Sequence, residues 1–181
     1  MKYGMYIDNL TIDGKPASYG VVNERDARAG AGIMLVIGMA TFIQAFLLGN
    51  FQVFIVVVSL FFLEFLIRVF NPHYAPFYAL GRLIVSKQRP EYSGAIQKRF
   101  AWGLGLGMAL AMMILVLGLG FRGAVPLAIC GICLTLLWLE TSFGICVGCK
   151  MYIGLQNIGL VKKPEVAPAC PGGVCPMPKK K

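Results

Sequence analysis

Charged and protonatable side chains are scarce in this sequence, which argues against an ordinary soluble domain. Only 14% of the 181 residues are charged, and there is a single histidine. No phosphate-binding motif, dinucleotide fingerprint or Ser/His/Asp arrangement occurs. The familiar signatures of soluble catalysis are therefore missing, and a different class of protein must be considered.

Apolar residues, in contrast, are abundant and lie in long runs. They make up 57% of the chain, and the mean hydropathy is +0.71. A helix needs about 20 apolar residues to cross the hydrocarbon core of a bilayer. We therefore predict an all-α integral membrane protein with four transmembrane helices in two hairpins, over Ala29–Gly49, Phe51–Phe70, Phe100–Phe121 and Ala124–Ile145.

The first 22 residues do not resemble a signal peptide, because they lack an apolar core and contain Asp8 and Asp13. We interpret residues 1–22 as a cytoplasmic segment. Asn23 is a suitable N-cap and Asp26 a capping-box partner, so the first helix is expected to begin before its apolar run.

The distribution of Lys and Arg predicts the orientation. With four spans, Arg122 is the single exception among 17 cations that otherwise lie on one side. The positive-inside rule places both termini and the long middle connection in the cytoplasm, across a bacterial cytoplasmic (inner) membrane. Anionic lipid headgroups account for the net charge of +9, and no nucleic-acid partner is needed to explain it.

The connection between the second and third spans predicts an interfacial amphipathic helix. Pro76 can start it and Pro90 ends it, and apolar residues recur between them at helical spacing. We assign residues 23–157 to the membrane domain. Residues 158–181, rich in proline and lysine, are predicted to form a flexible cytoplasmic tail.

The six cysteines form three pairs, namely Cys130/Cys133, Cys146/Cys149 and Cys170/Cys175. On a continuous fourth helix, Cys130 and Cys146 would lie about 24 Å apart along the axis. One tetrahedral metal site cannot contain both. We interpret Cys130 and Cys133 as packing residues, because buried thiols are unreactive; a second thiol pair is the alternative.

The spacing Cys146-Val147-Gly148-Cys149 suits a disulfide or shared ligation of a soft metal. Lys150 would favour a thiolate, whereas the negative end of a continuing helix would oppose it. We place this pair at the cytoplasmic boundary of the membrane, where water, enzymes and thiols can reach it.

Two carboxylates are expected inside the membrane near its cytoplasmic face. Glu64 has Arg68 one turn away, so a structural ion pair is the simpler interpretation. Glu140 has no charged partner on its own helix, and such a group in a membrane suggests a functional site. His73 lies just below and could join them.

The segments NPHYAPFYALGRLIV, QKRFAWGLG and FGICVGCKMY resemble a bacterial integral-membrane family catalogued as domain of unknown function 4395. The family pattern is matched by Arg99, Phe100, Ala101, Phe143, Gly144, Cys146, Gly148, Cys149 and Tyr152. The resemblance implies thiol or sulfur chemistry beside thioredoxin-like or sulfurtransferase proteins. Cys130, Cys133 and the cysteines of the tail depart from the pattern.

The leading hypothesis is a protein of thiol or sulfur metabolism in which Cys146 and Cys149 exchange thiols and Glu140 relays protons. The main alternative is a soft-metal protein that binds or transports Cu(I) or zinc through Cys170, Cys175 and Met177. A non-catalytic accessory subunit is the third. The sequence leaves open the cofactor, the enzyme class and whether the chain forms a homodimer, which a transport path would need.

Overall fold

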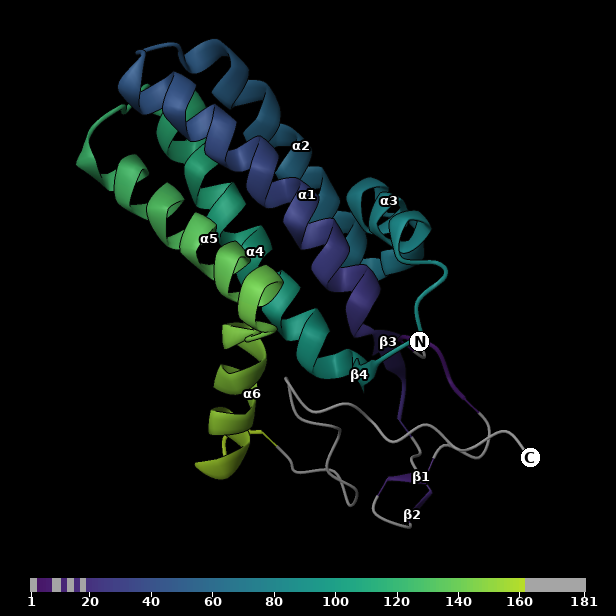
Figure 1. Cartoon of the computed structure of the whole chain (residues 1–181). Helices are drawn as coiled ribbons and strands as arrows, with labels where there is room; N and C mark the ends of the chain where they lie inside the picture. Colours follow the sequence, from purple (N-terminus) through teal and green to yellow (C-terminus); the bar gives the residue numbers. More distant parts are fainter. Residues whose placement is uncertain (1–2, 8–10, 13–14, 17–18, 162–181) are drawn as a thin grey trace.

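A computed structural model describes residues 3–7, 11–12, 15–16 and 19–161. The chain is predominantly helical, and its long helices form an elongated bundle (Figure 1). Four segments are long and apolar enough to cross a membrane: Glu24–Leu47, Phe51–Phe70, Ala95–Gly118 and Ala124–Phe143. The prediction of four such helices is confirmed.

The first two long helices follow their capping signals. Helix α1 (Glu24–Phe42) continues into a π-helical turn, η1 (Ile43–Leu47), and α2 (Phe51–Phe70) follows a short connection. The Asn23 side chain accepts from the backbone N–H of Arg25 at 3.2 Å and donates to Asp26 at 2.7 Å. The expected cap is therefore present, and α1 begins ahead of its apolar run.

The middle connection contains a turn of 3-10 helix, η2 (Pro72–Tyr74), and helix α3 (Pro76–Ile84), which starts at the predicted proline. Helix α3 packs closely against α1. A Cβ atom on Gly81 would lie only 2.4 Å from the backbone nitrogen of Gly30, so this crossing requires a residue without a side chain.

Two pairs of short antiparallel strands lie outside the long helices. Strand β3 (Val21–Asn23) pairs antiparallel with β4 (Tyr92–Gly94), and β1 (Thr11–Ile12) pairs with β2 (Lys15–Pro16). The β3–β4 pair, which sequence patterning did not predict, connects the starts of α1 and α4 and sets them side by side (Figure 1).

The second half of the chain has the same order of elements as the first: a long helix, a π-helical turn and another long helix. Helix α4 (Ala95–Met113) runs into a second π-helical turn, η3 (Ile114–Gly118), and is followed by α5 (Ala124–Phe143) and α6 (Val147–Asn157). The most extensive contacts among the long helices join α2 to α4 and α1 to α5. Helix α6 turns away from the end of α5 toward the start of α4 (Figure 1).

Candidate functional site

The fourth apolar helix, predicted over Ala124–Ile145, ends at Phe143 with Gly144 as its C-cap, so Cys146 and Cys149 do not lie on a continuation of it. Gly144 adopts φ 66°, the left-handed conformation typical of a helix C-terminus. The N–H of Ile145 donates back to the carbonyl of Leu139 at 3.0 Å. The chain then changes direction, and Cys146 becomes the N-cap of α6.

The thiols of Cys146 and Cys149 lie together at the start of α6. Their Sγ atoms are 2.7 Å apart, with Cys149 donating to Cys146. The two side chains are only 3% and 1% exposed, so the expectation of a solvent-accessible pair is wrong. The cause is the packing of α6 on α4, where a Cβ atom on Gly148 would meet Ala101 at 2.7 Å.

The pKa values of the two thiols are shifted in opposite directions. The hydrogen bond from Cys149 lowers the pKa of Cys146, burial opposes this effect, and the charge of Lys98 lowers the pKa further. The same hydrogen bond, together with burial, raises the pKa of Cys149. The helix end supports this order, because Cys146 lies at the positive end of α6 and not at the negative end of α5. Cys146 is therefore the more acidic of the two thiols, and Cys149 is its hydrogen-bond donor.

Lys98 of α4 is the charged centre of the site. Its side chain is fully buried, and its Nζ atom donates to Glu24 at 2.8 Å and to Glu140 at 2.7 Å. Ser93 donates to the other oxygen of Glu24 at 2.9 Å. Glu140 has no charged partner on its own helix, as expected, but the interpretation of it as an unpaired group is wrong, because Lys98 reaches it from α4.

Lys98 was not predicted as a site residue, because in the sequence it is one of several cations of the middle connection. The signal was its spacing: the inward-facing positions of α4 recur every three or four residues, at Ala95, Lys98, Trp102, Gly105, Ala109 and Met112. Lys150, the cation expected to act on the thiols, is exposed.

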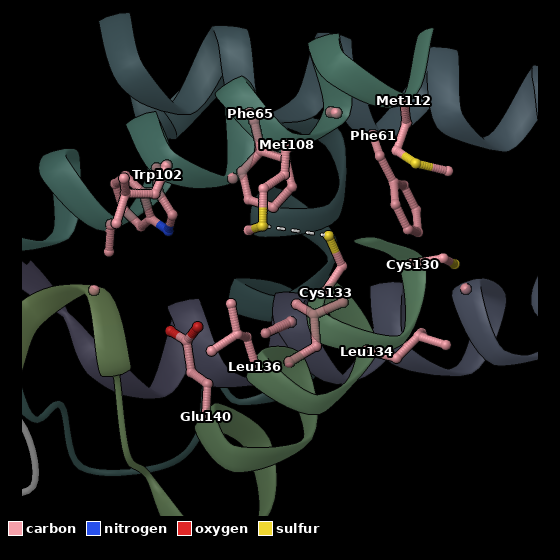
Figure 2. Close-up of a pocket in the computed structure, with 18 of the residues that line it drawn as sticks. Phe61, Phe65, Trp102, Met108, Met112, Cys130, Cys133, Leu134, Leu136 and Glu140 are labelled. Atoms are coloured by element: carbon pink, nitrogen blue, oxygen red, sulfur yellow. Dashed lines mark hydrogen bonds between the residues drawn. The ribbon is translucent and has the colours of Figure 1, made fainter. Parts of the chain in front are cut away.

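A cavity of about 330 Å³ extends between the long helices from this site toward the opposite end of the bundle (Figure 2). Aromatic and aliphatic side chains from all four helices form most of its wall, and Cys146 and Glu140 lie at one end. Trp102 and Phe65 face Glu140 across this space (Figure 2). The cavity thus connects the thiol site to the apolar interior.

Cys130 and Cys133 of α5 line the same cavity farther along the bundle. The Cys133 thiol contacts the sulfur of Met108 at 3.6 Å (Figure 2), whereas Cys130 packs beside a buried cluster that includes Phe54 and Met112. Among the described residues, no group of three or more His, Cys, Asp or Glu side chains is placed to hold a metal ion.

Glu64 and Arg68 form a buried pair, with Arg68 Nε donating to Glu64 Oε1 at 2.8 Å. The Glu64 carboxylate also accepts the backbone N–H groups of Phe77 and Tyr78, each at 2.9 Å, at the start of α3. This pair therefore attaches α3 to α2. His73 is exposed and its Nδ1 lies 2.7 Å from Arg82, so it does not join the two carboxylates.

The predicted metal ligands of the tail, Cys170, Cys175 and Met177, lie outside the described residues. No curated protein and no solved structure matches this chain. The model of one family does match, over residues 22–157, which include every described residue of the thiol site. The chain therefore belongs to the family described as Domain of unknown function (DUF4395).

Proposed function

We propose that this protein carries out thiol–disulfide or sulfur exchange in a membrane through Cys146 and Cys149. The observation that carries the proposal is the position of Cys146 at the start of α6, with the Cys149 thiol 2.7 Å away. Two sulfurs so placed need to approach by less than 1 Å to reach the disulfide bond length of about 2.05 Å.

The two cysteines have different roles in this proposal. The Cys146 thiolate attacks a partner disulfide, which forms a mixed disulfide and releases one partner thiolate; Cys149 then attacks Cys146 Sγ, which forms the Cys146–Cys149 disulfide and releases the second partner thiolate. In sulfur exchange, Cys146 takes the outer sulfur of a donor persulfide and the donor leaves as its thiolate. Lys98 stabilises the thiolate through its charge. Glu140, hydrogen-bonded to Lys98, is placed to take and return a proton at the end of the cavity.

We also propose a location and an orientation in the membrane. Two hairpins cross the bacterial inner membrane with both termini in the cytoplasm, as the distribution of cations favours. Helix α3, with Leu80, Leu83 and Ile84 exposed, lies along the cytoplasmic interface of the membrane. The thiol site is then at the cytoplasmic boundary.

The partners that we propose are thioredoxin-like or sulfurtransferase proteins of the cytoplasm. Since both thiols are buried, exchange with a protein requires α6 to move away from α4. A second copy of the chain is not needed for this chemistry.

A trapping experiment tests the exchange. With Cys149→Ser, Cys146 retains its partner's sulfur, so a mixed disulfide should accumulate with a cytoplasmic protein and disappear on reduction. The matched control is Cys133→Ser on α5, which leaves the pair intact and should trap nothing. If neither Cys146→Ser nor Cys149→Ser traps an adduct and either one releases bound copper or zinc, the site is a soft-metal site and the exchange proposal fails.

A further inference from the structure

We propose that the cavity binds a lipid-soluble quinone, and that this quinone oxidises the Cys146/Cys149 pair. The inference rests on the proposed function and names the electron acceptor for the same thiols. It follows from the lining of the cavity, from the thiol at its end and from the position of its mouth.

The lining selects an apolar ligand. Apart from Arg68, Glu140 and Thr41, the charged and polar groups characteristic of sites for ionic substrates are missing from the wall among the described residues. Phe65 and Trp102 offer ring faces on which a planar ring can stack. A volume of about 330 Å³ falls within the range of small-molecule sites and suits a ring with part of its tail.

The thiol at one end of the cavity favours a ligand that can accept electrons. Cys146 belongs to the wall, whereas Cys149 lies behind it and is 1% exposed. The cavity is thus in contact with the thiol that the site makes nucleophilic. A lipid acyl chain would fill the same space without any chemistry, but a quinone accepts the two electrons that a dithiol releases.

The mouth faces the lipid. Leu104 of α4 and Met151 of α6 line the cavity and are 36% and 51% exposed, so we place its opening between them. In a membrane this opening lies beside acyl chains and close to the thiol pair. A lipid-soluble molecule can therefore enter sideways without crossing water.

The reaction balances with these groups alone. The Cys146 thiolate adds to a ring carbon of the quinone, forming a carbon–sulfur bond. The Cys149 sulfur then attacks Cys146 Sγ, so that the disulfide forms, the carbon–sulfur bond breaks and its electron pair passes to the ring. Two protons go to the ring oxygens: one is the proton that Cys146 gives to Glu140 when it becomes a thiolate, and the other comes from the Cys149 thiol. One dithiol and one quinone give one disulfide and one quinol, and a cytoplasmic dithiol reduces the pair again.

The test uses the reduced full chain in lipid nanodiscs with a decyl-tailed benzoquinone. We expect one quinol for every two thiols lost, measured by quinone absorbance and thiol titration, and none with Cys146→Ser. A sulfonated, water-soluble quinone should react at least about tenfold more slowly, since an anion is costly to place in an apolar cavity.

Two leucines of α4 provide matched variants. Leu104→Trp fills the mouth and should slow quinol formation by about tenfold or more, whereas Leu110→Trp, on an exposed position outside the cavity, should leave it within about twofold. Equal rates for these two variants, or for the two quinones, would overturn the inference.

A water-soluble cyclic disulfide separates this inference from the proposed function. If it oxidises the wild-type pair while the decyl-tailed quinone does not, exchange stands and the quinone site is wrong. If neither reagent oxidises the pair, both proposals fail.

Discussion

Lys98 is the residue on which the charge balance of the site depends. A lysine buried this deeply is costly in isolation, and it is retained because two carboxylates, Glu24 and Glu140, accept its hydrogen bonds. The three charges come from three different helices, α1, α4 and α5. They therefore hold the helices in register as well as providing the cation for Cys146.

Replacing Lys98 by methionine should destabilise the protein by about 3 kcal/mol, because the buried Glu24 and the partly buried Glu140 lose their shared cation. The double variant Lys98→Met/Glu140→Gln should recover part of this loss, since one of those charges is removed with its partner. Unfolding in detergent by SDS, followed by circular dichroism, measures both.

Lys150→Met is the matched control for Lys98→Met. It removes an exposed cation that directly follows Cys149 in the sequence, and its effect on stability should stay below about 1 kcal/mol. The three-charge cluster would have no energetic role in either of two cases. One is that Lys98→Met lowers the free energy of unfolding no more than Lys150→Met. The other is that the double variant loses as much stability as Lys98→Met and Glu140→Gln together.

At the scale of secondary structure, the break at Gly144 decides how the cysteines are presented. A continuous helix would place Cys146 at a negative helix end, whereas the break gives it the positive end of α6. Arg28 of α1 packs directly on the break, and a Cβ atom on Gly144 would lie 2.1 Å from its guanidinium nitrogen. The backbone conformation therefore favours glycine, and a larger residue would also have to move the end of the Arg28 side chain.

Gly144→Ala should cost about 1–2 kcal/mol, because alanine is strained at this positive φ and also has to move the Arg28 guanidinium. The displaced α6 should also make Cys149 react faster with maleimide. The control is Gly154→Ala within α6, where a Cβ atom meets open space and alanine should stabilise the helix by about 0.5–1 kcal/mol. Equal effects at the two glycines would refute the role given to the break.

The elements that could be predicted are those set by local signals. Continuous apolar runs predicted the four long helices, and Pro76 and Asn23 marked the starts of α3 and α1. The break at Gly144 could not be predicted, because a glycine within an apolar run is also typical of close helix packing. Strand β4 was missed for another reason: its three residues are set by pairing with β3, far away in the sequence.

At the scale of the whole molecule, the site depends on contacts that no sequence pattern encodes. Cys146, Cys149 and Glu140 could be found from the sequence, but Lys98 joins them only because the fold brings the first turns of α4 close to Glu24 of α1 and Glu140 of α5. The cavity is likewise a property of four helices together. Pair spacing can suggest thiol chemistry, therefore, whereas the charge and the apolar access that tune it come from the tertiary fold.

The proposed orientation predicts which positions a reagent outside the cell can reach. In intact cells, a maleimide that cannot cross the membrane should fail to label Cys170 and Cys175, and should label them once the cells are permeabilised. Introduced cysteines in the two short connections, Leu48→Cys and Leu119→Cys, should be labelled without permeabilisation. Both positions are more than 70% exposed, so their reactivity reports topology and not burial.

The two introduced cysteines also separate the orientation from the hairpins. If both stay unlabelled while the tail reacts, the protein is inverted and the thiol site faces the outside, where it would meet oxidants and not cytoplasmic dithiols. If only one reacts, one of the hairpins does not form as predicted. Cys146 lies at the cytoplasmic boundary, as exchange with cytoplasmic partners requires, if both introduced cysteines are labelled from outside and the tail cysteines are not.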